Sequence, residues 1–245
     1  MYKENPKTKG SGIIAAIPQE GRCPQECADC FFQSGRSYLE PLEDNLPNLP
    51  PVEMISNSVV RINDGHDSSI QTEKVLEWLE KAKPEHYFFN TSVPACLERF
   101  PGPVVLTVNP GISTDKSFYA IGKYAIPTNL MMVRVRTNTW NIDLVDQVVS
   151  YYTRSEVPVI LTFMAYYSPE SVPKEHHRNY QWRKRTLNSY WAITTSAWRR
   201  IMNRYRDNKW VHSCGKIEGE KGDTHCRFCG NCIREYFATM ERLPA

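Results

Sequence analysis

Short apolar segments alternate with amphipathic segments along most of this chain, and this alternation limits the folds that it can adopt. Buried β-strands are predicted at residues 12–18, 58–62, 86–89, 103–109, 129–136 and 157–166. Residues 72–81 and 143–153 have the apolar spacing of amphipathic helices. Strands that alternate with helices pair in parallel through right-handed crossovers. The sequence therefore predicts an α/β fold with a parallel sheet.

The composition sets outer limits on the class of protein. A chain of 245 residues with 41% hydrophobic content can bury one substantial core. Its formal net charge is only +3, whereas a dedicated nucleic-acid binder is strongly basic. A local basic patch is still compatible with this net charge. No apolar run approaches the length of a membrane-spanning helix, and the first residues are polar. We expect a cytoplasmic protein that does not contact the membrane.

The last third of the chain carries two further expectations. Residues 185–207 combine aromatic and basic side chains at roughly helical spacing, which predicts one long helix packed over the sheet. A short strand at 210–213 follows, and the domain boundary is placed there, with a main domain at 1–209 and a cysteine-rich segment at 210–245. The Pro-rich connection between residues 32 and 58 is expected to wrap the surface.

Seven of the eight cysteines fall into two groups. Cys23, Cys27 and Cys30 form the first group, and the second consists of Cys214, Cys226, Cys229 and Cys232. Cys96 stands alone and is interpreted as a small buried or loop thiol. Clustered thiols in a reducing compartment hold metal more often than they form disulfides. The sequence therefore predicts two metal sites.

The first group has the spacing C-x3-C-x2-C in the loop after the first predicted strand. Three thiolates on one loop can ligate three irons of a 4Fe-4S cluster and leave the fourth iron open to an exogenous chelating molecule. A zinc site is normally closed by a fourth Cys or His, and none lies within the next thirty residues. Zinc held by these cysteines and a remote His remains the alternative.

This triplet and its placement resemble the radical S-adenosylmethionine (radical SAM) superfamily. The resemblance implies a partial (β/α)6 barrel with a small C-terminal metal-binding extension. It also implies a 4Fe-4S cluster that binds S-adenosylmethionine, and an electron donor such as flavodoxin or ferredoxin. The implied activity is reductive cleavage of S-adenosylmethionine to a 5'-deoxyadenosyl radical, which abstracts hydrogen from a substrate.

The resemblance also implies contacts to the S-adenosylmethionine. An aromatic residue usually precedes the third cysteine in the family, but Asp29 stands there, so Phe31 and Phe32 are the expected adenine contacts. The stretch Asn63-Asp64-Gly65, with Asp67, occupies the place where the family binds the methionine amino group. On turn chemistry alone, the same stretch is equally compatible with an Asn-Asp-Gly turn before a helix.

Polar residues at later strand ends complete the expected cofactor site, because ligands of such sheets bind at the carboxyl ends of the strands. By resemblance, the ribose hydroxyls and the methionine carboxylate would be bound from this set, which comprises Thr107, Asn109, Arg134, Arg136, Asn138, Thr162 and Tyr166. Strand alternation places Arg134 and Arg136 on one face and Val133 and Val135 on the other. Tyr166 is the candidate for contact with the substrate.

The second cysteine group provides four thiolates within nineteen residues, enough to close a metal site. Its C-x2-C-G portion is typical of zinc, whereas C-x2-C-x2-C is the spacing of a 4Fe-4S cluster. Radical SAM enzymes often carry auxiliary clusters in such extensions, which favours a second 4Fe-4S cluster over zinc. His212 and His225 flank the group.

The substrate class rests on two stretches that mix basic and aromatic residues, 176–185 and 198–206. Such stretches suit phosphate contacts and base stacking, although a solvated basic helix face has the same composition. We expect a small-molecule or nucleic-acid substrate, with modification or isomerisation of a nucleotide or nucleic-acid base favoured over peptide modification. The alternative of another class is a non-catalytic module that holds zinc at both sites and docks on nucleic acid.

Overall fold

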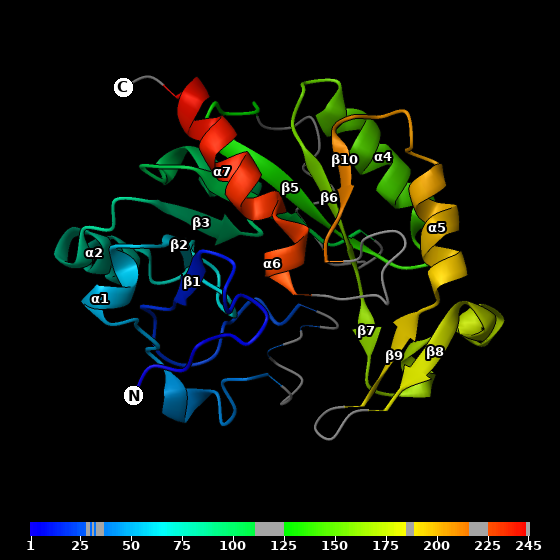
Figure 1. Ribbon diagram of the computed structural model, residues 1–245, viewed down its shortest axis with the longest axis horizontal. Helices are drawn as coiled ribbons and strands as arrows, with labels where there is room; N and C mark the ends of the chain where they lie inside the picture. Colours follow the sequence, from blue (N-terminus) through cyan, green and yellow to red (C-terminus); the bar gives the residue numbers. More distant parts are fainter. Residues whose placement is uncertain are drawn as a thin grey trace.

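Seven strands of the computed structural model form one sheet in the order β1-β2-β3-β4-β5-β6-β10, in which every neighbouring pair is parallel (Figure 1). The structure describes residues 1–27, 30, 32, 37–110, 125–184, 189–215 and 225–243. The strands of this sheet are β1 (Ile13–Ala16), β2 (Val59–Ile62), β3 (Tyr87–Thr91), β4 (Val104–Val108), β5 (Leu130–Thr137), β6 (Val159–Phe163) and β10 (Val211–Ser213). The helices are α1 (Val52–Ile55), α2 (Thr72–Ala82), α4 (Ile142–Thr153), α5 (Thr195–Asn203), α6 (Cys226–Cys229) and α7 (Asn231–Arg242).

The spatial order of the strands follows their order in the chain, and this explains where the helices lie. Because right-handed crossovers between successive neighbours all fall on the same side of a sheet, they place their helices on one face. That face carries the larger core, to which α4 contributes Val145 and Val148 and α5 contributes Trp198 and Ile201. The predicted α/β class is confirmed, and the predicted strands of the sheet and two amphipathic helices form close to their expected bounds.

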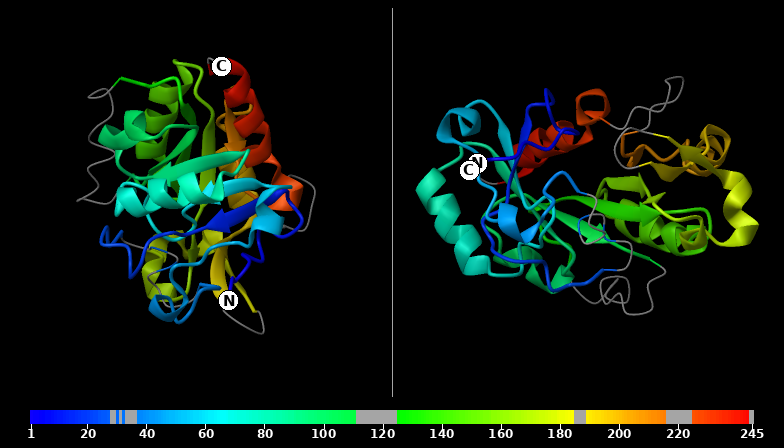
Figure 2. Two further views of the ribbon diagram at one scale, coloured as in Figure 1. Left: turned by 90° about the vertical axis from the view of Figure 1, so that its left-hand side faces the viewer. Right: turned by 90° about the horizontal axis from the view of Figure 1, so that it is seen from below.

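The C-terminal helix α7 covers the opposite face of the sheet. Figure 2 shows α7 and α4 on opposite sides of the strands. The Tyr236 ring is 1% exposed and lies in a second core cluster with Val59, Phe88, Val105 and Ile160, which come from four different strands. The segment after residue 209 is therefore built into the main sheet through β10 and into its core through α7. We call this side of the sheet the α7 face.

The prediction of one helix over residues 185–207 is wrong. The range contains β9 (Tyr190–Ile193), and among its described residues only Thr195–Asn203 forms an α-helix. The aromatic and β-branched run Tyr-Trp-Ala-Ile suits a strand, because such side chains pack well on a pleated surface. The Thr194 hydroxyl then accepts a hydrogen bond from the Ala197 amide at 3.3 Å and begins the helix as its N-cap.

A small antiparallel sheet lies beyond the carboxyl end of β6. It has the order β7-β9-β8, where β7 is Ala165–Tyr166 and β8 is Tyr180–Arg183. In Figure 1 the small sheet lies below the parallel strands, next to their carboxyl ends. Among the described residues, no helix combines the length and the apolar character needed to cross a bilayer.

The connection between Phe32 and Ser58, which was predicted to wrap the surface, is partly buried and contains regular structure. It contains α1 and one short 3-10 turn, Glu43–Asn45. The side chains of Leu39 and Leu42 are almost completely buried against Ile17, where they form a small separate cluster. This cluster fixes the start of the first cysteine loop, because Ile17 lies directly after β1 and also pairs with Asn48 through two backbone hydrogen bonds of 2.9 Å.

Candidate metal and cofactor site

The carboxyl ends of the parallel strands meet at one edge of the sheet, and the first cysteine loop leaves β1 at that edge. Cys23, Cys27 and Cys30 are all half-buried, and the Cys30 amide donates a hydrogen bond of 3.0 Å to the Cys27 carbonyl. The pKa of the Cys23 thiol is raised to about 11, mainly by burial, with smaller contributions from the nearby Asp67, Cys27 and Cys30, while a backbone hydrogen bond from Gln25 acts in the opposite direction. The three thiols are thus close enough to interact electrostatically beside the loop that follows β2.

Gly65 in that second loop is packed directly against an aromatic ring. A Cβ atom built on Gly65 would clash with the ring of Phe32, whose Cε1 atom would lie only 2.7 Å away. The Phe32 ring also meets Tyr38 edge-on at a centroid distance of 6.1 Å. The close approach that Gly65 permits is therefore used by Phe32, one of the two expected adenine contacts. The other, Phe31, lies outside the described residues.

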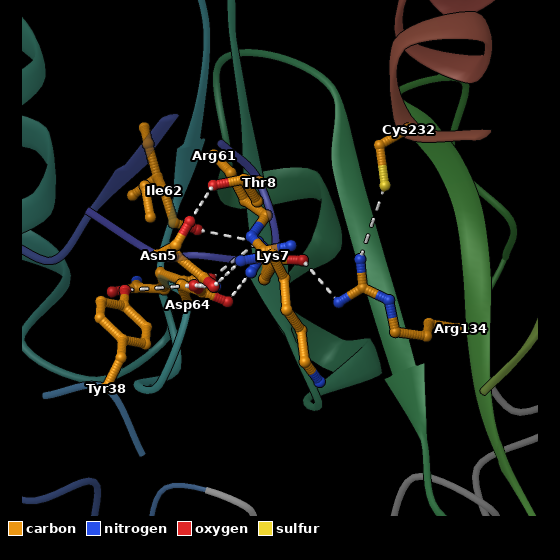
Figure 3. A network of polar contacts seen from close by, with 12 residues as sticks. Asn5, Lys7, Thr8, Tyr38, Arg61, Ile62, Asp64, Arg134 and Cys232 are labelled. Carbon is orange, nitrogen blue, oxygen red and sulfur yellow. Dashed lines mark hydrogen bonds and ion pairs between the residues drawn. The ribbon is translucent and has the colours of Figure 1, made fainter. Parts of the chain in front are cut away.

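Asp64, an expected ligand for the amino group, is engaged by its own chain (Figure 3). It forms an ion pair with Arg61 and accepts hydrogen bonds from the Asn5 amide and, at 3.2 Å, from the Tyr38 hydroxyl. The side chains of both Arg61 and Asp64 are at most 10% exposed. A buried charge requires a partner of this kind, so Asp64 neutralises Arg61 within the site.

Asp67 ties two chain segments together at the same edge. Its carboxylate accepts five hydrogen bonds of 2.6 to 2.9 Å from the amides and hydroxyls of Ser69 and Ser92 and from the hydroxyl of Thr91. Both carboxylate oxygens are occupied by these donors. The geometry makes Asp67 a brace between the loop after β2 and the end of β3.

Three buried polar atoms between these loops have no hydrogen-bond partner among the described residues. They are Gln19 Oε1, Asn63 Oδ1 and His66 Nε2, which come from the loops after β1 and β2. Asn63 also has a φ of 71°, a strained left-handed conformation that places its amide Nδ2 2.7 Å from the Ser68 hydroxyl. Buried polar atoms are costly to leave unpaired, so this group of atoms points to a polar ligand at the edge.

The α7 face changes character along the strands. On four strands, an apolar residue under α7 is followed two positions later by a polar residue on the same face, nearer the carboxyl end. The pairs are Val59 and Arg61, Phe88 and Asn90, Met132 and Arg134, and Ile160 and Thr162. The amino half of this face is therefore core, and the carboxyl half is lined by polar and cationic groups.

Arg134 belongs to this polar half, and Figure 3 shows its guanidinium pointing toward Cys232. Its guanidinium donates to Asn90 Oδ1 at 3.4 Å and to Cys232 Sγ at 3.9 Å. Thr107 is its neighbour on β4, and Arg136 lies two residues further toward the carboxyl end, opposite Thr162 of β6. Val133 and Val135 lie in the core on the other face, which confirms the predicted alternation.

The remaining expected site residues serve different roles. Asn138 is buried, and its Oδ1 accepts hydrogen bonds from the Trp140 and Asn141 amides at 3.0 and 2.9 Å, which shapes the turn before α4. Its Nδ2 donates to the Tyr166 hydroxyl at 3.3 Å, and Tyr166 is itself buried. Asn109 is half-buried at the end of β4.

The four C-terminal cysteines gather beside Arg134. The Cys214 thiol donates a hydrogen bond to Cys229, so the pKa of Cys214 is raised and that of Cys229 is lowered to about 6. The Cys229 sulfur also accepts from the amides of Asn231 and Gly215. The Cys226 amide donates to the Lys7 carbonyl at 2.8 Å, which connects this segment to the N-terminal strap, residues 1–11.

Two guanidinium groups face these thiols. Burial lowers the pKa of Arg61, and Arg134 lowers it further, whereas Cys226 and Cys232 act in the opposite direction. Burial raises the pKa of Cys226, and Arg61 and Arg134 both lower it. Cationic side chains next to thiols favour the thiolate form that binds metals. As they stand, no three His, Cys, Asp or Glu side chains of the described part converge closely enough to hold a metal ion.

Sequence reasoning missed several residues of this site. Arg61 interrupts the otherwise apolar run Val-Val-Arg-Ile. Its charge was the only feature of the sequence to indicate that one face of this strand becomes polar. Asn5, Gln19 and Asn90 are single amides without a motif, and only the packing brings them to the site.

Comparison with known proteins adds no relative, because no family model, curated protein or solved structure matches this chain. The interpretation of the site therefore depends on its own residues.

Proposed function

We propose that this protein is a radical SAM enzyme whose sheet corresponds to a partial (β/α)6 barrel. Cys23, Cys27 and Cys30 would hold a 4Fe-4S cluster at the carboxyl edge, and S-adenosylmethionine would bind beside it. The observation that supports this most directly is that Cys23 lies close enough to Asp67 for their charges to interact, and that the loop of Asp67 also holds the unpartnered buried atoms Asn63 Oδ1 and His66 Nε2. Gln19, whose Oε1 is also unpartnered, donates a hydrogen bond of 3.1 Å to the Asp67 carbonyl. Three thiols beside unpartnered polar atoms fit a cluster with one open iron better than a closed zinc site.

When bound and reduced by a flavodoxin or ferredoxin, the cluster would supply the electron that cleaves S-adenosylmethionine to a 5'-deoxyadenosyl radical, which abstracts hydrogen from the substrate. The chain's own residues supply the polar groups of the site. Gln19 Oε1 and Asn63 Oδ1 are acceptors suited to an ammonium group, and Arg136 is suited to a carboxylate. Asp64 and Asp67, already hydrogen-bonded, would hold the surrounding loops in place instead of contacting the cofactor.

For the second site we propose a metal centre held by Cys214, Cys226, Cys229 and Cys232. Four thiolates carry four negative charges, which exceed the charge of Zn²⁺ or of an oxidised 4Fe-4S core. Arg61 and Arg134 would offset the remainder on the α7 face, where their charges already influence Cys226. The proposed substrate is a base of a nucleotide or nucleic acid, and the adjoining small sheet supports this class through its aromatic and basic residues.

Anaerobic reconstitution with iron and sulfide tests the proposal. We expect two 4Fe-4S clusters, or one cluster and one zinc ion, together with formation of 5'-deoxyadenosine from S-adenosylmethionine after reduction with dithionite. The Cys27→Ala variant should lose the first cluster and all cleavage, whereas Cys229→Ala should keep the first cluster. Cys96→Ala is the matched control, because Cys96 lies outside both groups and should leave iron content and cleavage unchanged.

Two outcomes would refute the proposal. One is uptake of two zinc ions without any iron–sulfur absorption or cleavage, which would favour the non-catalytic zinc module. The other is cleavage that persists in Cys27→Ala, since the open iron would then be held elsewhere.

A further inference from the structure

Positive charge is concentrated in one short part of this nearly neutral chain. Residues 174–206 contain nine Lys and Arg and a single acidic residue, Glu175, whereas the formal net charge of the whole chain is only +3. The remaining residues therefore carry a net negative charge. Such separation of charge indicates a surface that meets a polyanion.

The same part of the chain builds a row of aromatic rings on one face of the small sheet. Cross-strand pairing sets Trp191 of β9 directly opposite Tyr166 of β7 and Trp182 of β8. Trp182 and Trp191 have a centroid distance of 6.1 Å, and His177 packs against Trp191 at 5.8 Å. Trp182 is 48% exposed, a large value for a tryptophan on a sheet. The outer end of the row is thus open to solvent.

The inner end of this row reaches the proposed active site. The buried Tyr166 ring packs against Trp140 at 5.3 Å, and its hydroxyl accepts a hydrogen bond from Asn138, the residue directly after β5. Figure 1 shows the small sheet at the end of the parallel strands where the first cysteine loop also lies. A ligand on Trp182 and Trp191 would therefore lie next to the carboxyl edge of the main sheet.

Exposed cations flank the open end of the row. Lys174 and Arg178 belong to the 3-10 helix Lys174–Asn179, which also carries His177, and both are exposed. Lys184 is exposed and follows Trp182 by two residues, a spacing that keeps it on the same side of an extended strand. Phosphate-binding cations thus lie around rings on which a base can stack.

We propose that this surface binds single-stranded nucleic acid, with bases stacked on Trp182 and Trp191 and phosphates near Lys174, Arg178 and Lys184. Rings that stack on base faces select unpaired bases, while the cations follow the backbone. The inference rests on the proposed function, because it names the substrate class of that site. An acidic peptide would match the charge but would leave the aromatic row without a partner.

Fluorescence anisotropy of the full chain with labelled oligonucleotides of about 12 nucleotides tests this surface. We expect single-stranded RNA or DNA to bind more tightly than a duplex of the same sequence, and the RNA and DNA arms identify the preferred sugar. Trp182→Ala should weaken binding about 5- to 100-fold through loss of stacking. Phe237→Ala is the matched control, because Phe237 is an equally exposed aromatic residue on α7 and should bind normally.

The salt dependence tests the charges separately. The double variant Arg178→Gln/Lys184→Gln should reduce the slope of log affinity against log salt by about 1.4, since each phosphate contact on a single strand contributes about 0.7. The double variant Lys81→Gln/Lys83→Gln removes the same charge from the exposed C-terminal end of α2 and its capping residue, and should leave the slope unchanged. The inference is overturned if Trp182→Ala binds like Phe237→Ala, if the two double variants behave alike, or if duplex or poly-glutamate competes as well as single strands.

Failure of this inference can be told apart from failure of the proposed function. Cys27→Ala should bind the oligonucleotide normally while cleaving no S-adenosylmethionine, because the two readouts depend on different residues. Cleavage by the unmodified protein without oligonucleotide binding would refute only the nucleic-acid surface. Binding without any iron or cleavage would refute only the radical SAM proposal.

Discussion

The guanidinium of Arg134 lies 3.9 Å from the sulfur of Cys232, although the two residues are 98 positions apart in the chain. This contact joins β5 to the C-terminal cysteine segment. Asn90 shares the same guanidinium at 3.4 Å, so β3, β5 and α7 meet at one cation. The second cysteine group therefore faces the polar half of the α7 face and is held there by the main domain.

Removal of this cation should weaken metal binding at the second cysteine group. We expect Arg134→Gln to lower the affinity for Co²⁺ by about 10- to 100-fold, because partners of metal ligands contribute effects of this size. The sulfur-to-cobalt charge-transfer band measured during titration reports the site directly. Arg134→Lys should keep part of the affinity, and Lys81→Gln should have no effect. Equal Co²⁺ affinities in all variants would show that the contact is incidental.

Tyr236 should be essential for holding α7 on the sheet. Its ring is 1% exposed and packs on Phe88 with a centroid distance of 6.4 Å. We expect Tyr236→Ala to lower the free energy of unfolding by about 3–5 kcal/mol through loss of buried area and formation of a cavity. Urea unfolding followed by circular dichroism measures the change. Met240→Ala, on the exposed side of α7, should cost less than about 1 kcal/mol; equal losses would contradict the packing.

The Asp67 carboxylate should be required as a charged acceptor. In Asp67→Asn, an NH₂ group replaces one carboxylate oxygen. The NH₂ group is a donor and would face the hydroxyl and amide donors that the oxygen accepted from, so these hydrogen bonds are lost. We expect the free energy of unfolding to fall by about 2–4 kcal/mol, since hydrogen bonds to a charged group are worth more than neutral ones. Asp44→Asn changes an exposed carboxylate and should cost less than about 0.5 kcal/mol in the same urea experiment. An unchanged stability of Asp67→Asn would contradict the bracing role.

His66 should make the protein less stable in mild acid. Burial lowers the pKa of His66, although the adjacent Asp67 opposes this shift. In the unfolded chain the imidazole has its ordinary pKa of about 6.5 and binds a proton there before the folded protein does. The stabilisation is therefore complete above about pH 6.5 and is lost as the pH falls through this value toward the lower pKa of the folded state.

The His66→Gln variant isolates this contribution. Its free energy of unfolding should change less than that of the unmodified protein between about pH 7.5 and pH 5. His212, whose pKa is also lowered first by burial, contributes with the same sign and remains in the variant. If the free energy of unfolding in urea had the same pH dependence in both proteins, His66 would not be a buried imidazole that stays neutral in the folded state.

Local patterns predicted much of this fold. Apolar runs marked the strands of the main sheet, and alternation along β5 placed Arg134 and Arg136 on the face opposite Val133 and Val135. The same reasoning failed over residues 185–207, because aromatic residues at helical spacing also fit a strand followed by a capped helix. The pairing of β9 with β7 and β8 decided between them, and pairing partners distant in sequence cannot be read from one segment.

The candidate site, too, was predicted in part from the sequence and was decided in part by the tertiary structure. The spacing of Cys23, Cys27 and Cys30 within a loop after the first strand is a property of the sequence, because residues so close along the chain must share one loop. The hydrogen bond of Gln19 to Asp67, the contact of Asn5 with Asp64, and the approach of Cys232 to Arg134 arise only when strands and α7 pack together. By itself the sequence determined the elements and the ligand types, since these depend on neighbouring residues. The tertiary structure alone decided which polar groups face one another, since burial and partner choice depend on contacts between distant segments.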